Sequence, residues 1–178
     1  LPQGAGPGSL TGQNNRSSTQ GERTLSADGN RVLFTSSADG LSASDDNRLE
    51  NLFVRDRVSN ETILVNVGLG GAPADDAGVG AQISGDGGKV VFFSDATNLV
   101  GGLPAGTSGI YLRDLAAGTT QLVSRADGAG GPPAGRPASP AISQDGSTIA
   151  FITETSLDAA DTNGTFDVYV RKLAANDT

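Results

Sequence analysis

The feature that most constrains this chain is a motif, Ser-x-Asp-Gly, that occurs three times. Its aspartates are Asp28, Asp86 and Asp145, so the motif recurs every 58 or 59 residues. Each copy lies between two apolar stretches, and Asp-Gly in that setting indicates a β-hairpin because Gly accepts the positive φ of a tight turn. A repeat of this length predicts stacked copies of one supersecondary unit.

Two further segments keep step with the hairpin motif. One places an aromatic residue two positions before an arginine, at intervals of 58 residues. Its aromatic residues are Phe53, Tyr111 and Tyr169. The other, Thr-x-Leu-Val, occupies 62–65 and 120–123, and its next copy would begin at Thr178. Each repeat is therefore expected to supply four antiparallel strands, the last repeat lacking its fourth.

Four antiparallel strands per repeat, stacked face to face, describe the blades of a β-propeller. We therefore expect an all-β fold of three blades, a partial or half propeller. A parallel β-helix is the alternative, although its coils are generally shorter and lack hairpin turns. The three repeats are expected at residues 16–66, 67–124 and 125–178, after a poorly structured N-terminal segment at 1–15.

The composition narrows the possible functions. A formal charge of −8 would repel a polyphosphate backbone, which argues against nucleic-acid binding. The chain has no cysteine, so thiolate metal sites are excluded, and no apolar run approaches the length of a membrane span. It also has no histidine, so a Ser-His-Asp triad cannot be built. No catalytic residue is assigned, and the chain is not expected to be an enzyme by itself.

The repeats resemble the TolB-like or PD40 family, the WD40-like propeller repeats of bacterial periplasmic and surface proteins. The resemblance rests on segments 143–146, 161–164 and 167–171, with the Gly-Thr-Thr turn at 118–120, and covers about residues 16 to 178. It implies a propeller fold and a periplasmic, secreted or cell-surface location. It also implies a binding scaffold or the propeller part of a larger protein.

The number of repeats leaves two possibilities open. Closed propellers use about four to eight blades, so three cannot close a ring with normal geometry. Either the chain is part of something longer, or copies of it associate through exposed edge strands. Two head-to-tail copies would make a six-bladed ring, which removes the unpaired edges.

One loop of the last repeat has the pattern of a calcium-binding loop. Its oxygen side chains alternate along the sequence, at Asp161, Asn163, Thr165 and Asp167. Such spacing lets a short loop wrap Ca²⁺. The alternative is that these side chains only stabilise a tight loop through Asx turns. The repeat before it has apolar residues and glycine instead, namely Leu103, Ala105 and Gly109. The first repeat carries a weaker version beginning at Asp45.

The repeated arginines, Arg55, Arg113 and Arg171, also allow two interpretations. They could ring an anion-binding surface. The structural interpretation, which we favour, pairs each with a carboxylate of a neighbouring hairpin, such as the aspartates of the Ser-x-Asp-Gly motif.

These observations predict a non-enzymatic propeller segment, exported or on the cell surface, that presents loops to a protein, peptide or glycan partner. The alternative is the accessory propeller of a larger hydrolase whose catalytic residues lie outside this chain. A third reading is a carboxylate-based glycosidase that uses Asp45, Asp46 and Glu50. It requires two acids about 5 to 9.5 Å apart in a central cleft.

Overall fold

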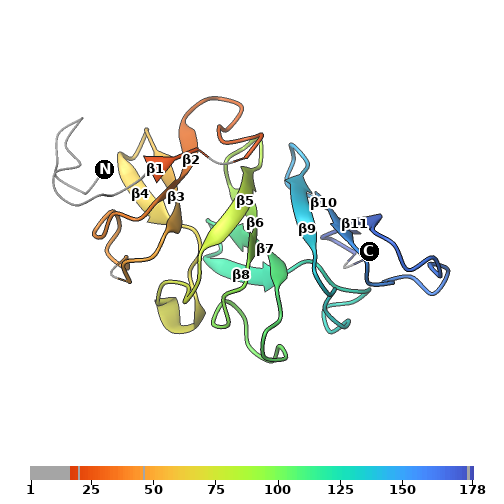
Figure 1. Cartoon of the computed structure of the whole chain (residues 1–178). Coiled ribbons are helices and arrows are strands. Elements are labelled where there is room, and N and C mark those ends of the chain that lie inside the picture. Colours follow the sequence, from red (N-terminus) through yellow and green to blue (C-terminus); the bar gives the residue numbers. More distant parts are fainter. Residues whose placement is uncertain (1–16, 20, 46, 176) are drawn as a thin grey trace.

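The structure is a computed structural model that describes residues 17–19, 21–45, 47–175 and 177–178. The segment 1–15, expected to be poorly structured, lies outside the described residues. Three antiparallel sheets stand side by side in chain order (Figure 1). The described residues form no α-helix, only the 3₁₀ turn η1 (Leu69–Gly71), and hence no helix able to span a membrane. The predicted all-β class is confirmed.

We refer to the three sheets as blades 1, 2 and 3. Blade 1 contains β1 (Ser17–Ser18), β2 (Arg31–Ser36), β3 (Asn51–Asp56) and β4 (Glu61–Leu64). Blade 2 contains β5 (Gly78–Ile83), β6 (Lys89–Ser94), β7 (Gly109–Asp114) and β8 (Thr119–Leu122). Blade 3 contains β9 (Ala138–Ile142), β10 (Thr148–Thr153) and β11 (Asp167–Lys172). The third blade thus has three strands, as expected.

The Ser-x-Asp-Gly motif forms the corner between the first two strands of blades 2 and 3. In blade 2 the Ser84 hydroxyl donates to Asp86 at 2.6 Å, and the Gly88 N–H donates to the same carboxylate at 2.9 Å. Gly87 has a φ of 72°, which glycine adopts without strain. The same bonds recur around Asp28 in blade 1 and Asp145 in blade 3.

The core lies between the blades rather than inside one sheet. Val54 of blade 1 packs in one cluster with Phe92 and Tyr111 of blade 2. A second cluster joins Ile110 of blade 2 to Tyr169 of blade 3. Blade 2 therefore contributes one apolar face to blade 1 and the other to blade 3.

The corners are also bonded to one another. The Ala27 N–H donates to the Gly85 carbonyl at 2.7 Å, and the Gly85 N–H donates to the Gln144 carbonyl at 2.7 Å. Side chains cross the same junctions: Arg31 Nη1 reaches the Gly87 carbonyl at 3.0 Å, and Lys89 Nζ reaches that of Gly146 at 3.1 Å. The three corners therefore occupy equivalent positions in a stack of similar units.

Candidate functional site

The first strands of blades 2 and 3, β5 and β9, are edge strands and lie next to each other. The segment that leads into blade 1 runs along β5, where the Ile83 N–H donates to the Arg23 carbonyl at 3.0 Å. Arg23 then reaches the Ile142 carbonyl of blade 3 at 3.1 Å through Nη1. These contacts bring parts of all three blades together on one side of the molecule.

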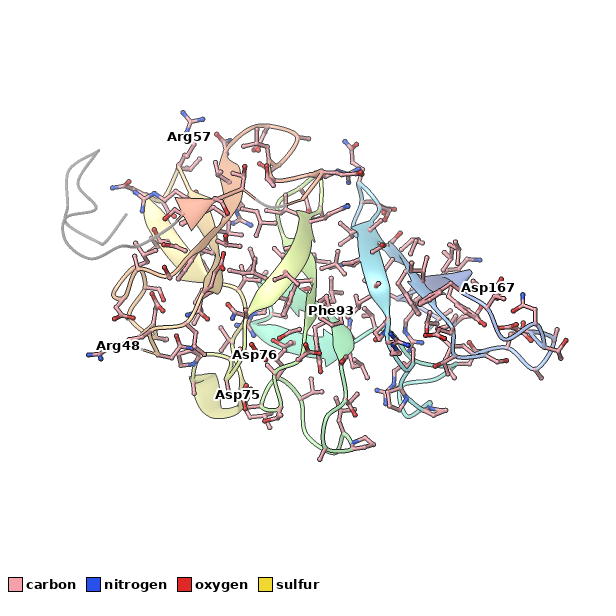
Figure 2. The ribbon with its side chains drawn as sticks, in the orientation of Figure 1. Arg48, Arg57, Asp75, Asp76, Phe93 and Asp167 are labelled. Carbon is pink, nitrogen blue, oxygen red and sulfur yellow. The ribbon has the colours of Figure 1, made fainter. Side chains whose placement is uncertain are left out.

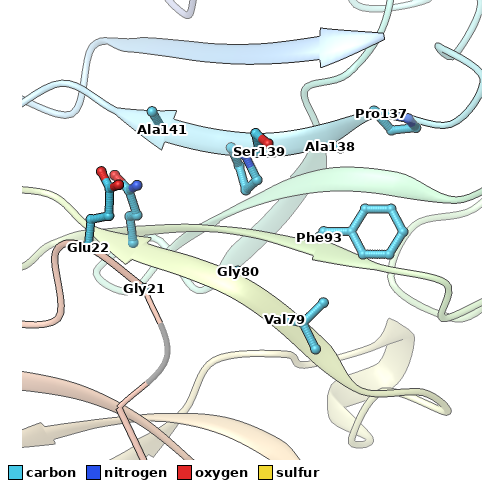
Figure 3. Close-up of a pocket in the computed structure, with 11 residues that line it drawn as sticks. Gly21, Glu22, Val79, Gly80, Phe93, Pro137, Ala138, Ser139 and Ala141 are labelled. Carbon is cyan, nitrogen blue, oxygen red and sulfur yellow. The ribbon is translucent and has the colours of Figure 1, made fainter. Parts of the chain in front are cut away.

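An open groove of about 560 Å³ lies between these strands (Figure 3). Its walls include Val79 and Phe93 of blade 2 and Pro137 and Pro140 at β9. Glu22 is the one charged side chain among the described residues that line it. Figure 3 shows Glu22 at one end of the groove and Phe93, Val79 and Pro137 toward the other. The groove is therefore mainly apolar, with an acid at one end.

A β-bulge shapes each wall. In β5, two residues between Val79 and Gln82 oppose a single residue of β6, and β9 shows the same irregularity against β10. The exposed residue of each bulge has left-handed backbone, with a φ of 60° at Gly80 and 53° at Ser139. Bulges bend an edge strand and re-aim its side chains, and here both do so at the groove.

The groove was not predicted from the sequence. Its walls come from segments that the repeats mark only as first strands. The signals that could have located the bulges are Gly80 and Pro140, because glycine or proline inside a strand often marks a bulge. Gly80 and Ser139 are 59 residues apart and occupy equivalent positions in their repeats, which the structure shows because each lies in a bulge.

The loop predicted to hold calcium forms local hydrogen bonds. The Asp161 carboxylate accepts the Tyr169 hydroxyl at 2.5 Å, and the Asn163 side-chain oxygen accepts the Thr165 N–H at 2.8 Å. The bond from Thr165 to Asn163 is of the Asx-turn kind, whereas the bond from Tyr169 joins the loop to β11. Among the described residues, no group of three or more acidic, His or Cys side chains is placed to hold a metal. The loop lies in blade 3, at one end of the row of blades. Figure 2 shows Asp167 of blade 3 and Arg57 of blade 1 toward opposite ends of that row. Calcium binding at this loop stays a prediction.

The repeated arginines do not bond the corner aspartates. Arg113 Nη1 donates to the Thr120 hydroxyl at 3.1 Å and to the Gly118 carbonyl at 2.9 Å, and Arg55 bonds Thr62 in the same way. Arg171 is 2% exposed and donates to the backbone carbonyls of Arg125, Ala126 and Gly128. The expectation of structural arginines fits these contacts, but the predicted carboxylate partners were wrong.

The acids considered for glycosidase chemistry lie elsewhere. Asp45 is 4% exposed and accepts a hydrogen bond from Asn51 at 3.1 Å within blade 1, and Asn51 bonds Asn66 at 2.7 Å in the same buried polar group. Glu50 is half-buried, and Asp46 lies outside the described residues. Neither Asp45 nor Glu50 lines the groove. Among the described residues that line the groove, Glu22 is the one acid, so they do not supply the paired acids that such an enzyme requires.

No family model matches the chain, and no curated protein matches it. Solved structures do resemble it. A putative TolB from Agrobacterium tumefaciens is 14% identical, with a TM-score of 0.50 over 88% of this chain and 46% of that one. An oligogalacturonate lyase from Vibrio parahaemolyticus is 14% identical, with a TM-score of 0.51 over 94% of this chain and 41% of that one.

A structure from work on two prolyl endopeptidases is 15% identical, with a TM-score of 0.50 over 89% of this chain and 21% of that one. The chain thus spans less than half the length of each of these proteins. Their common feature is the β-propeller. The corner bonds, the cores between blades and these likenesses agree that the chain is a three-bladed segment of β-propeller fold.

Proposed function

We propose that this chain is a TolB-like, non-enzymatic binding segment of an exported or cell-surface protein, and that its groove binds an extended peptide segment of a partner protein. The observation that carries the proposal is an open, mainly apolar groove bounded by two edge strands. Edge strands offer unpaired backbone N–H and C=O groups, which an added extended peptide can satisfy. On β5 such a peptide would pair away from Ile83, whose N–H already donates to Arg23.

The side chains of the groove favour a peptide over a glycan. Val79 is 41% exposed and lies with Phe93 and two prolines, so the apolar side chains of a peptide find a matching wall. Phe93 is the one aromatic residue among the described lining residues, and the polar side chains that line the groove with it are Glu22, Gln82 and Ser139. One ring and three polar side chains match a peptide better than the many hydroxyl groups of a sugar. A glycan that bound in preference to every peptide would argue against the proposal.

The charge of the groove selects the peptide further. Glu22 stands at one end of the groove, in a chain with a net charge of −8. A basic residue of the ligand gains from both the local acid and the long-range field, whereas an acidic one is repelled. The proposed ligand is therefore an extended segment with apolar residues and one Lys or Arg.

The test uses two short fluorescent peptides that alternate valine and proline around a central lysine or a central glutamate. Fluorescence anisotropy should show binding of the lysine peptide and weaker binding of the glutamate peptide. Glu22→Gln should weaken the binding of the lysine peptide by about threefold to fivefold, the value of one exposed ion pair. The same change should leave the binding of the glutamate peptide unchanged or make it tighter. Val79→Asp should weaken both peptides.

Val58→Asp is the matched control, because Val58 is 76% exposed in the turn between β3 and β4, outside the groove. It should bind both peptides as the unchanged protein does. If neither peptide binds, or if Glu22→Gln leaves the preference for lysine unchanged, the proposed ligand is wrong.

A further inference from the structure

The loop before β11 contains the one Asn-Gly pair of the sequence, Asn163 and Gly164. Asparagine is a chemically labile residue, and a following glycine has no side chain to hinder attack by its own backbone nitrogen on the asparagine side chain. Such attack is the first step of deamidation. Whether a given pair reacts depends on the fold, which either leaves the nitrogen free or holds it in a hydrogen bond.

The backbone nitrogen of Gly164 is accessible. Residues 162–166 are exposed and lie outside the strands. No described residue accepts a hydrogen bond from the Gly164 N–H. Apart from its chain neighbours, no atom lies within 4 Å of the position that a Cβ of Gly164 would take. Attack by this nitrogen therefore breaks no existing hydrogen bond and displaces no neighbouring group.

The Asp-Gly pairs of the three corners show the opposite arrangement. The Gly146 N–H donates to the Ser143 carbonyl at 3.0 Å. Gly29 and Gly87 make the same bond in their own corners, at 2.9 Å. A nitrogen whose N–H is bonded in this way must lose that bond before it attacks. The corners therefore protect their glycine nitrogens, whereas the loop before β11 does not.

The side-chain amide of Asn163 is polarised toward attack. Its oxygen accepts the Thr165 N–H at 2.8 Å and the Thr165 hydroxyl at 2.9 Å. Because that oxygen reaches two residues ahead, the side chain folds back over its own backbone and brings Cγ toward the peptide bond to Gly164. Negative charge develops on the amide oxygen during attack, and the two donors stabilise it, as in an oxyanion hole.

We propose that Asn163 is a site of spontaneous deamidation in the folded protein and that Thr165 promotes the reaction. The Gly164 nitrogen forms a bond to Asn163 Cγ, and the bond from Cγ to Nδ2 breaks. Nδ2 takes up the proton of the Gly164 nitrogen and leaves as ammonia. Water then opens the five-membered imide at one of its two carbonyls, which gives aspartate or isoaspartate at position 163. The reaction is intramolecular and needs water alone as co-reactant.

Both products change the loop. Each adds one negative charge to a chain with a net charge of −8. Isoaspartate also lengthens the backbone by one carbon between Asp161 and Tyr169, whose side chains are bonded at 2.5 Å. That bond joins the loop to β11, so the isoaspartate form should hold the loop less firmly. No residue of this loop is among the described residues that line the groove, so the inference stands apart from peptide binding.

The test is incubation of the full chain at body temperature and mildly alkaline pH, followed by proteolysis and mass spectrometry. Conversion of Asn163 raises the mass of its peptide by about 1 Da, because OH replaces NH₂. Labelling by an isoaspartyl methyltransferase identifies the isoaspartate product. We expect Asn163 to convert at least as fast as it does in a synthetic peptide of residues 158–168. A rate more than about tenfold below that of the peptide would overturn the proposal, because the fold would then protect the pair.

A matched pair of substitutions tests the role of Thr165. Thr165→Val removes the hydroxyl donor and keeps the N–H, so it should slow the conversion by about twofold to tenfold, the value of one hydrogen bond. Thr162→Val removes an exposed hydroxyl of the same loop, which makes no bond to Asn163, and should leave the rate unchanged. Equal rates in the two variants would show that the hydroxyl does not promote the reaction.

Asp145→Asn tests the protected case within the same chain. It introduces a second Asn-Gly pair, whose glycine, Gly146, has its N–H bonded to Ser143. We expect this pair to convert more than about tenfold more slowly than Asn163. Conversion of both pairs at the same rate would overturn the proposal, because a free glycine nitrogen would then not be what selects Asn163.

Discussion

Tyr111 and Tyr169 occupy the same position in adjacent blades, yet their hydroxyl groups differ in environment. The Tyr169 hydroxyl donates to Asp161 at 2.5 Å and accepts the Leu157 N–H at 3.1 Å. The Tyr111 hydroxyl is buried, and no described residue bonds it. Both side chains pack in the cores between blades, so the two sites isolate the contribution of one hydroxyl group.

We therefore expect opposite effects from the same substitution. Tyr169→Phe should lower the free energy of unfolding by about 1 to 2 kcal/mol, because it leaves the Leu157 N–H and the Asp161 carboxylate without this partner. Tyr111→Phe should be neutral or stabilising by up to about 1 kcal/mol, because it removes an unsatisfied buried group. Blade 1 already has Phe53 at this position. Urea denaturation measures both; equal losses would contradict the assignment.

The two bulges at the groove make a second matched pair. Gly80→Ala should destabilise the protein by about 1 to 2 kcal/mol, because its φ of 60° strains any side chain although the nearest atom to an added Cβ lies 3.8 Å away. Ser139→Gly should stabilise it by up to about 1 kcal/mol, since it relieves a non-glycine residue at a φ of 53°. Thermal unfolding of both variants checks this, and a destabilised Ser139→Gly would show that the serine side chain has a structural role.

Because of the corner aspartates, we expect the free energy of unfolding to fall in acid. Hydrogen bonds from the Ser143 hydroxyl, first, and the Ser147 N–H lower the pKa of Asp145 to about 2, and bonds from Ser26 and Asn30 do the same for Asp28. A carboxyl whose pKa is lower in the folded state stabilises the fold above its unfolded pKa of 3.8. That contribution declines as the pH falls from about 4 toward 2.

The measurement is the urea midpoint as a function of pH, with NMR titration of Asp145. Asp145→Asn should flatten the decline between these pH values, and Ser143→Ala should raise the pKa of Asp145 because it removes the largest cause of the shift. An unchanged pKa in Ser143→Ala would exclude the hydroxyl as that cause.

Much of the fold could be predicted because its determinants are local. Ser84, Asp86 and Gly87 make a corner among themselves, so the motif alone locates it. The hydrogen-bond partners of the arginines could not be predicted from the repeat spacing, because that spacing does not show which residues face each other on adjacent strands. Arg113 pairs in register with Thr120 in the β7–β8 hairpin, and that cross-strand relation was the overlooked signal.

The groove depends on contacts between blades, which the sequence of one repeat does not show. The side chains of β5 and β9 meet only after the blades have stacked, and the bulge at Ser139 is defined by the register of β9 against β10. No local pattern encodes such a site. The loop predicted to bind calcium has a clear local pattern at Asp161 and Asn163, but that pattern fits both a calcium site and a loop held by Asx turns.

Ala27 donates to Gly85 and Gly85 donates to Gln144, so both bonds run from a corner to its C-terminal neighbour and give the stack a polarity. A duplicated unit inserted at any junction finds its acceptor ahead and its donor behind without a single new residue. The corner bonds therefore place no demand on the side chains when a whole repeat is added in tandem, and the match between blades is set by their apolar faces.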